Sequence, residues 1–366
     1  MKIKKYRLDE ILKRNADYNV IFGERSSGKS YAALEYGAQH YFETGRRTVI
    51  IRRWKEDFIG PLSARTCYDS LCNDSLHRNR ISDLSGERYQ GVEYYSGKYF
   101  LTQLDENGVM KKTDQVIAYG VAITQGDHLK MGSFPDVDIV IFDEFMTRNG
   151  YLPDEFIYFQ NVLSTIIRDR DDVKIFMLGN NVDKFNCPYF TEMGLTHIHE
   201  QKQNTIDVYE YGDSGLRVAV EWTENLSATK KSNKYFAFNN PRLQMITDGK
   251  WELGIYPHKP RDYNEFDVVF SYFIIFNNRT VQCDIISDDI STFTFIHNKT
   301  TPIRDKNPII YTLTPTDDPL TYVRIDKPCN RITERIYKFY VERRVFYQDN
   351  EVGEFVTSYI YQASRV

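Results

Sequence analysis

The stretch Gly23-Glu24-Arg25-Ser26-Ser27-Gly28-Lys29-Ser30 decides the fold, because it matches the phosphate-binding pattern G-x-x-x-x-G-K-[ST] at every fixed position. An apolar run at residues 18–22 precedes it, and residues 29–43, which contain good helix formers, follow it. A strand, a glycine-rich loop and a helix in this order direct backbone N–H groups and the positive end of a helix dipole at a phosphate. The sequence therefore predicts a P-loop (Walker A) nucleotide site made by residues 23–30 and the next residue, Tyr31.

A second strand ends in two carboxylates, which read as a Walker B motif. Residues 138–144 are DIVIFDE, so four apolar residues deliver the acidic pair Asp143 and Glu144 to the end of a buried strand. Asp143 and the Ser30 hydroxyl are predicted to bind Mg²⁺, while Lys29 reaches the β- and γ-phosphates. Glu144 is placed to polarise a water molecule. Because a P-loop kinase needs no such glutamate, the motif favours hydrolysis of ATP.

Further polar residues are candidates for the same site. Asn180 follows an apolar strand, where it would sense the γ-phosphate and hold the water, although a turn asparagine is an equal reading. Arg25 lies inside the loop and would act in cis on the phosphates. Arg168 and Arg170 end a predicted helix, and a ring-forming motor would point one of them into its neighbour's site as an arginine finger. By spacing alone, arginines at such positions are more often solvated charges that interact favourably with the helix dipole.

The first half of the chain alternates strand and helix signals, which predicts an α/β domain with a mainly parallel sheet. Turn pairs and short aromatic runs predict an antiparallel insert within it. The predicted elements, in order, are strand 18–22, helix 29–43, strand 48–51, insert 92–123, strand 137–142, helix 153–170 and strand 173–178.

The pattern changes near residue 200, and a chain of 366 residues suits two domains. We therefore predict a P-loop ATPase domain at 1–200, a linker segment at 201–240 and a smaller α+β domain at 241–366. Beyond residue 200 the predicted elements are strands 207–211, 216–222, 268–276 and 281–286, a hairpin turn at 277–279, and helices 331–344 and 351–362.

Composition excludes several classes of protein. The 47 basic and 51 acidic residues give a net charge of −4, which argues against coating nucleic acid by bulk charge. A local basic segment remains at Arg52-Arg53-Trp54-Lys55. Its basic side chains and its tryptophan suit contact with the DNA backbone, which we expect through Arg53 and Lys55. The longest apolar run, 268–276, is too short to span a bilayer. Five scattered cysteines are expected to be free thiols in a reducing cytoplasm.

Four runs in order carry a resemblance to a known family. They are residues 20–32 around the P-loop, 50–55 (IIRRWK), 139–145 (IVIFDEF) and 166–180 (IIRDRDDVKIFMLGN). With this spacing the chain resembles the genome-packaging ATPases of phi29-type podophages, which are relatives of the terminase large subunits. The resemblance covers about residues 18–190, while the C-terminal half matches loosely.

The resemblance implies an ASCE-type ATPase that uses ATP and Mg²⁺ to translocate double-stranded DNA into a procapsid. The active form would be a homo-oligomeric ring, a pentamer docked on the portal directly or through a structural RNA. The chain would be a monomer in solution before assembly, in the cytoplasm of the infected host and without any membrane association. The second domain would resemble an RNase H-like nuclease that has lost its metal carboxylates.

Residue roles carried over from the family fall on matching positions. Lys29, Ser30 and Arg25 would serve the phosphates, and Asp143 and Glu144 would be the magnesium ligand and the catalytic glutamate. The resemblance also places the trans-acting finger at Arg168 and a DNA contact at Lys55, and it alone suggests that Lys130 acts across subunits.

Two alternatives stay open at this stage. One is a terminase-type ATPase with an active metal-dependent nuclease domain. Its candidate carboxylates are Asp207, Asp284, Asp288, Asp289, Asp317 and Asp318. The other is a nucleotide-switched assembly protein that binds ATP without useful turnover. Glu144 is the feature that argues against it.

Overall fold

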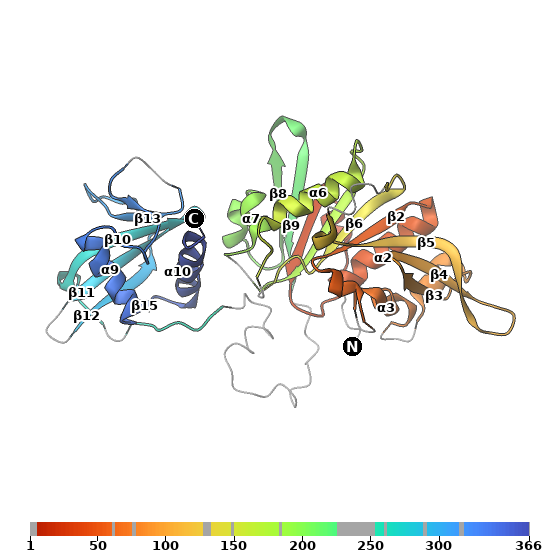
Figure 1. Cartoon of the computed structure of the whole chain (residues 1–366), viewed down its shortest axis with the longest axis horizontal. Coiled ribbons are helices and arrows are strands. Elements are labelled where there is room, and N and C mark those ends of the chain that lie inside the picture. Colours follow the sequence, from red (N-terminus) through yellow and green to blue (C-terminus); the bar gives the residue numbers. More distant parts are fainter. Residues whose placement is uncertain are drawn as a thin grey trace, which may run out of the picture. The chain divides into compact units, whose positions relative to one another are not determined.

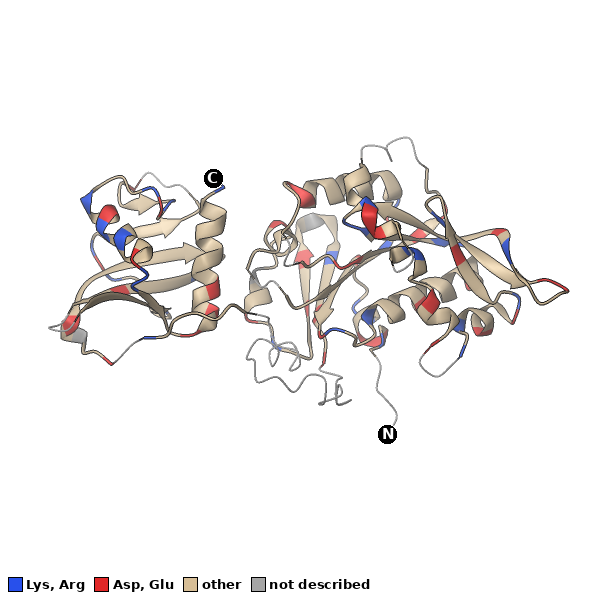
Figure 2. Cartoon of the chain, turned by 60° about the horizontal axis from the view of Figure 1, so that its bottom comes forward, with Lys and Arg blue, Asp and Glu red and all other residues tan. Residues whose placement is uncertain are grey.

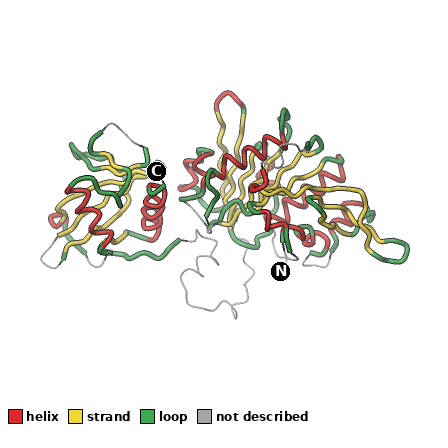
Figure 3. Tube along the Cα trace, in the orientation of Figure 1, coloured by secondary structure: helices red, strands yellow, loops and turns green. Residues whose placement is uncertain are grey.

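The computed structural model describes residues 6–60, 63–74, 78–126, 133–147, 150–182, 185–224, 253–259, 262–287, 291–314 and 318–365. They form two compact units, each built on one sheet flanked by helices (Figures 1 and 3). The first unit holds the described residues up to Val182 and those from Pro188 to residue 224. The second holds residues 185–187 and those from 253 onward. None of the helices within these ranges is both long and apolar enough to cross a bilayer.

The first unit contains the elements that carry the predicted nucleotide motifs. In chain order they are α1 (Asp9–Leu12), β1 (Tyr18–Gly23), α2 (Lys29–Thr44), β2 (Arg47–Arg52), α3 (Asp69–Cys72), α4 (Arg80–Ser85), β3 (Gly91–Tyr95), β4 (Lys98–Leu104), β5 (Met110–Ala122), β6 (Val137–Asp143), α6 (Glu155–Ile167), β7 (Lys174–Asn180), α7 (Pro188–Glu192), β8 (Thr205–Tyr211) and β9 (Leu216–Trp222).

Nine strands in the described part of the first unit form one sheet, in the order β3-β4-β5-β2-β6-β7-β1-β9-β8. The six strands from β5 to β9 in this order run parallel, and antiparallel pairs occupy both edges. This confirms the mainly parallel sheet. The predicted insert forms β3, β4 and β5, and it extends the main sheet because β5 pairs with β2.

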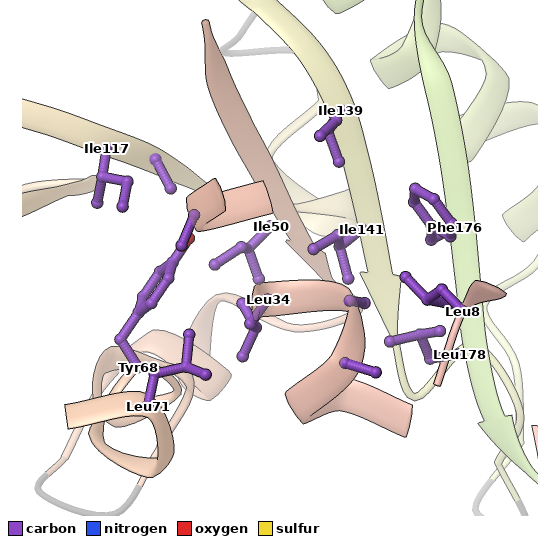
Figure 4. Packing of buried hydrophobic residues seen from close by; sticks show 14 of the residues in the cluster. Leu8, Leu34, Ile50, Tyr68, Leu71, Ile117, Ile139, Ile141, Phe176 and Leu178 are labelled. Carbon is purple, nitrogen blue, oxygen red and sulfur yellow. The ribbon is translucent and has the colours of Figure 1, made fainter. Parts of the chain in front are cut away.

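Alternating side chains cover both faces of this sheet, as a pleated strand requires. Ile141 of β6 belongs to a core with Leu34 of α2 and Ile50 of β2 (Figure 4). The next residue, Phe142, lies in a second, aromatic layer, where its ring stacks on Phe159 of α6 with centroids 5.1 Å apart. Helices on both faces explain why β6 is continuously apolar and buried from Ile139 to Phe142.

The first sheet runs past the domain boundary predicted at residue 200, which is therefore placed too early. β9 pairs parallel with β1, from Tyr18 opposite Val218 to Phe22 opposite Trp222. β1 carries the P-loop and lies inside the sheet, so it needs a partner on each side to satisfy its buried backbone groups. β9 supplies one of these partners. The rest of the predicted linker, from residue 225 to 240, lies outside the described residues.

The second unit is a mixed sheet covered by two helices. Its elements are β10 (Val268–Phe276), β11 (Arg279–Ser287), β12 (Thr292–Asn298), β13 (Ile310–Thr312), β14 (Thr321–Tyr322), α9 (Arg331–Val341), β15 (Val345–Tyr347) and α10 (Asn350–Ala363). The strand order is β14-β13-β10-β11-β12-β15. The sequence reading missed the seven-residue β12. It also missed β13, β14 and β15, because segments of two or three residues carry no periodicity.

Helix ends and one turn differ in detail from the sequence prediction. α6 begins at Glu155 and ends at Ile167, inside the predicted 153–170, because Asp154 and Arg168 have φ values of 52° and 53°. The predicted turn at 277–279 is the two-residue pair Asn277 and Asn278, both with positive φ, and Arg279 already belongs to β11. Asparagine tolerates this left-handed backbone better than most residues, which suits a tight hairpin.

A hydrogen bond ties the segment before β1 to the end of β9. The buried Tyr6 hydroxyl donates to Glu221 Oε2 at 2.6 Å, and the Tyr6 backbone N–H donates to Ser27 O of the P-loop at 3.1 Å. Burial raises the pKa of Glu221 to about 7. The protonated carboxyl is therefore the form that this position favours.

We expect Glu221→Gln to change how the stability of the first unit depends on pH. An acid whose pKa is raised by folding stabilises the fold below its unfolded pKa and loses that contribution as pH rises through the folded value. For a shift from 4.5 to about 7 the loss is at most about 3 kcal/mol. The free energy of unfolding of the wild type, measured by urea denaturation, should fall between pH 5 and pH 8. In Glu221→Gln this fall should be smaller. The exposed Glu210→Gln on β8 is the matched control, and an equal flattening there would contradict the assignment.

Candidate phosphate-binding site

The P-loop adopts a backbone that only glycine permits at its first position. Gly23 has φ 156°, and a Cβ there would lie 2.1 Å from Thr223 Oγ1, just beyond β9. Gly28 caps α2 with φ 99°, which is also a left-handed conformation. The loop therefore turns tightly between β1 and α2, as the motif predicts, with β9 closing it from one side.

Lys29 lies inside this loop with its ammonium group among neutral oxygens. Its Nζ donates to Glu24 O at 2.6 Å, to Ser27 Oγ at 3.3 Å and to Gly23 O at 3.4 Å. Burial lowers the pKa of Lys29 to about 8, although the Asp143 and Glu24 carboxylates oppose this effect. A desolvated ammonium held by neutral acceptors is suited to receiving an anion, so these residues fit a phosphate group.

The predicted metal ligands lie side by side. Ser30 Oγ donates to Asp143 Oδ1 at 3.0 Å, which joins the first turn of α2 to the end of β6. Because β6 is parallel to its neighbours, its carboxyl end reaches the same edge of the sheet as the P-loop. A hydroxyl beside a carboxylate is the oxygen pair that Mg²⁺ takes in nucleotide sites, so the residues present fit this ion.

Glu144 departs from the strand immediately after Asp143. Its φ of 60° turns the chain, and its backbone N–H donates to Asp143 Oδ1 at 3.1 Å. Arg52 at the end of β2 bridges the two carboxylates, with 3.2 Å to Asp143 Oδ2 and 2.6 Å to Glu144 Oε2. This third residue was not among the predicted site residues. The Glu144 carboxylate is therefore held by a cation of the same chain.

Asn180 also reaches the P-loop. β7 pairs with β1 so that Asn180 lies opposite Gly23, and Asn180 Oδ1 accepts from Lys29 Nζ at 3.5 Å. The next residue, Asn181, donates its backbone N–H to Gly23 O at 3.4 Å. The structure thus brings together the predicted Lys29, Ser30, Asp143, Glu144 and Asn180.

A cavity of about 390 Å³ adjoins the P-loop and was not predicted from the sequence. Tyr31, which follows the motif, lines it together with Tyr6 and Arg7 of the N-terminal segment. Arg78 and Arg80 also line it. Its place beside α2 depends on the hydrogen bond between Tyr6 N and Ser27 O, which joins positions that no local motif relates.

Arg53 does not fit the predicted contact with DNA. Its side chain is 7% exposed and forms a bidentate ion pair with Glu155, whose side chain is fully buried. The same guanidinium donates to Phe145 O at 2.7 Å and to Glu144 O at 3.2 Å. Burying a charge is costly unless it is paired and hydrogen-bonded, and this cluster provides both. Arg53 therefore holds the backbone that follows Asp143.

The other predicted cations lie in different settings. Lys55 and Arg25 are exposed, and Trp54 next to Lys55 is 43% exposed. Arg168 is exposed at the end of α6, whereas Arg170 donates to Phe134 O and to Ile166 O and lies 3.5 Å from Asp138. Lys130 lies outside the described residues. Basic and acidic residues are interspersed over the first unit rather than gathered into one large patch (Figure 2).

The candidate nuclease carboxylates lie in different units. Asp207 lies on β8 of the first sheet, so it does not belong to the second unit. Asp284 on β11 has its two oxygens occupied by hydrogen bonds from Ser271 and Gln282 and by a contact with His297. No cluster of three or more metal-binding side chains occurs within the described ranges, from which Asp288, Asp289 and Asp317 are missing.

Comparison with known proteins identifies related sequences. The family model of the podovirus DNA encapsidation protein (Gp16) matches residues 105–317, more than half of the chain. The DNA packaging protein of Bacillus phage phi29 is 22% identical over 205 residues, covering 55% of this chain and 54% of that protein. The DNA packaging protein of Bacillus phage B103 is 24% identical over 182 residues, covering 48% of each chain.

A solved structure shows the same fold. The bacteriophage phi29 viral genome packaging motor assembly contains a chain with a TM-score of 0.57 and 17% identity, over 99% of this chain and 98% of that one. By sequence, the chain spans about half the length of the curated relatives it matches. The family match begins after the P-loop and extends into the second unit, further than the motif resemblance over residues 18–190.

We expect Arg53→Ala to destabilise the first unit by about 3–5 kcal/mol, because it leaves Glu155 charged and buried without its partner. The exposed Lys55→Ala should change stability by less than about 0.5 kcal/mol. Urea denaturation checks both values. Binding of double-stranded DNA should rank the variants the other way. The binding constant should depend less steeply on salt concentration in Lys55→Ala than in Arg53→Ala. A fully stable Arg53→Ala variant with weakened DNA binding would restore the original prediction for Arg53.

Proposed function

The chain belongs to the podovirus DNA encapsidation protein (Gp16) family, and we propose that it is an ATPase that drives double-stranded DNA into a viral procapsid. The observation that carries the ATPase assignment is the meeting of Lys29, Ser30, Asp143, Glu144 and Asn180 at one edge of a parallel sheet. A P-loop with its acidic strand and a polar strand end is the set of groups that nucleotide hydrolysis requires.

Each of these residues has a distinct task in hydrolysis. Lys29 neutralises charge on the β- and γ-phosphates, and Asn180 beside it senses the γ-phosphate and holds the attacking water. Glu144 accepts a proton from water, and Arg52 holds its carboxylate through Oε2. Ser30 and Asp143 would hold Mg²⁺, which supplies charge neutralisation to the phosphates.

The nucleoside is proposed to occupy the cavity beside Tyr31. The cavity adjoins the P-loop through Tyr6, and its lining includes Tyr6 and Tyr31 together with Arg7 and Arg78, which pair with Asp9 and Asp74. Aromatic and arginine side chains stack on purine bases, so this lining suits an adenine.

Assembly into a ring is proposed from the position of Arg168. This residue is exposed at the end of α6, at the position that the resemblance gives to the trans-acting finger, which supports Arg168 as the residue that completes a neighbour's site. Lys130 is proposed to act across subunits by resemblance only. The ring would be a pentamer on the portal of the procapsid, docked directly or through a structural RNA. The chain would act in the host cytoplasm.

Contact with DNA is proposed for a small surface around Lys55. Lys55 and the neighbouring Trp54 are exposed, whereas Arg52 and Arg53 are engaged with carboxylates of the first unit. One or two cations suit a motor that must release DNA in every cycle, because each phosphate contact adds to the affinity and to its salt dependence.

The second unit is proposed to be an RNase H-like domain without nuclease activity. Its strands β10, β11 and β12 form an antiparallel meander, and β13 and β14 continue the sheet parallel to β10. This arrangement of strands supports the RNase H-like fold that the resemblance implies. The hydrogen bonds that occupy Asp284 support a structural role for the one candidate carboxylate buried in this sheet.

Glu144→Gln should bind ATP with nearly unchanged affinity while turnover falls by roughly 10²–10⁴-fold, because the general base is lost and the phosphate contacts remain. Steady-state ATPase assays with and without double-stranded DNA, together with an ATP binding titration, measure both effects. Lys29→Ala is the comparison variant and should lose binding. Unchanged turnover in Glu144→Gln would contradict the role of this residue. Negligible wild-type activity in the presence of DNA and procapsids would favour the assembly-protein alternative.

Mixed subunits test the action of Arg168 in trans. An assembly of Arg168→Ala subunits should lose roughly 10³-fold or more in turnover, as should one of Lys29→Ala subunits. Mixing the two should restore part of the activity, because some interfaces then join an intact P-loop to an intact Arg168. Arg170→Ala replaces Arg168→Ala in the control mixture, where no such gain is expected. Failure of every Arg168→Ala mixture to regain activity would refute the trans assignment.

A further inference from the structure

Residues 185–187, which lie between β7 and α7, belong to the second unit, although β7, Asn181, Val182 and α7 belong to the first. Phe185 from this segment is 1% exposed in the core that contains α10 and the strands β10 and β11. We propose that Phe185 is a positioning residue that couples the nucleotide site of the first unit to the second unit. The coupling rests on the proposed function only in requiring that the P-loop binds a nucleotide.

Aromatic and cationic contacts fix the Phe185 ring. It meets the Phe355 ring of α10 edge to face, with centroids 5.7 Å apart. The Arg279 guanidinium at the start of β11 lies 5.9 Å from the Phe185 centroid and 5.3 Å from that of Phe355. Arg279 is itself held by Glu351 at 2.8 Å and by Asn298 at 2.9 Å. The ring is therefore enclosed by groups that have defined positions of their own.

Hydrogen bonds to α10 fix the backbone around the ring. Asn186 Nδ2 donates to Ser358 Oγ at 2.9 Å, and Gln362 Nε2 donates to Phe185 O at 3.3 Å. Connecting segments usually run over a surface, because a buried one leaves backbone groups without partners. Here α10 supplies these partners, which is the arrangement expected of an anchor.

The same segment begins at the nucleotide site. Asn180 Oδ1 accepts from Lys29 Nζ, and Asn181 N donates to Gly23 O. Phe185 follows Asn180 by five positions in the sequence. A nucleotide that changes the hydrogen bonds of Lys29 therefore acts on a strand end whose continuation is anchored in the core of the second unit. Packed side chains and hydrogen-bond networks carry energetic coupling between distant sites, and a measured response at the second site demonstrates it.

A simpler explanation is that Phe185 only fills the core of the second unit. Phe276 of β10 provides the comparison, since it is 4% exposed and its ring lies 5.5 Å from that of Phe355. Truncating either ring removes one aromatic contact with Phe355. Only Phe185 is also connected through a few residues to Asn180. A core-filling role predicts the same behaviour for both variants, whereas coupling predicts a difference.

Hydrogen exchange of the full chain, measured by mass spectrometry with and without Mg²⁺ and ATPγS, tests the proposal. In the wild type the nucleotide should change exchange rates in α10 by about fivefold or more, the lower end of usual coupling between sites. The change should persist in Phe276→Ala and fall below about twofold in Phe185→Ala. Nucleotide affinity, titrated separately, should stay within about twofold of the wild type in both variants. Phe185→Leu should restore part of the response.

If Phe185→Ala does not fold, the double variant Asn186→Ala/Gln362→Ala tests the coupling in its place. It removes the side-chain hydrogen bonds between this segment and α10 and keeps the Phe185 ring. It should lower the response of α10 at unchanged nucleotide affinity. An unchanged exchange rate in α10 of a nucleotide-bound wild type overturns the coupling and leaves the proposed function intact. An equal response in Phe185→Ala and Phe276→Ala overturns it as well. A wild-type chain that binds no nucleotide overturns both proposals.

Discussion

The parallel pairing of β1 with β7 and of β7 with β6 is the constraint on which the nucleotide site depends. Strands that run in the same direction end at the same edge of the sheet. Gly23, Asn180 and Asp143 therefore meet there although they are far apart in the sequence. The P-loop then needs only a tight turn to place Lys29 beside Asn180 and Ser30 beside Asp143. β9 completes this arrangement by giving β1 its second partner.

Two consecutive arginines show how the same residue type serves different ends according to burial. Arg52 ends β2 at the edge of the sheet, where it bridges Asp143 and the exposed Glu144. Arg53 points into the first unit, where Glu155 and two backbone carbonyl groups receive it. A partly exposed ion pair such as that of Glu144 is weak enough to be exchanged for water. The buried pair has no such exchange available, so it fixes the chain that follows Asp143.

The chain passes from the first unit into the second and back again, so the two units are not consecutive in the sequence. β8 and β9 return to the first sheet after Phe185 has already entered the core of the second unit. A boundary drawn at a single residue therefore misrepresents the architecture. The consequence is physical as well as descriptive, because a strand end at the nucleotide site continues directly into a segment whose packing depends on α10.

The sequence by itself determined the elements whose signals are local. The glycine spacing of residues 23–30 predicted a loop between β1 and α2, and apolar runs predicted β6, β7 and β10, because these patterns arise from neighbours within one strand or one turn. Short strands such as β13 and β14 were missed for the same reason. Tertiary structure decided every pairing between distant positions. It assigned Arg52 to Glu144, Arg53 to Glu155 and Tyr6 to Glu221. A charged residue at a strand end has the same local sequence pattern whether it faces solvent or a buried carboxylate. Only the packing of the chain around it distinguishes the two settings.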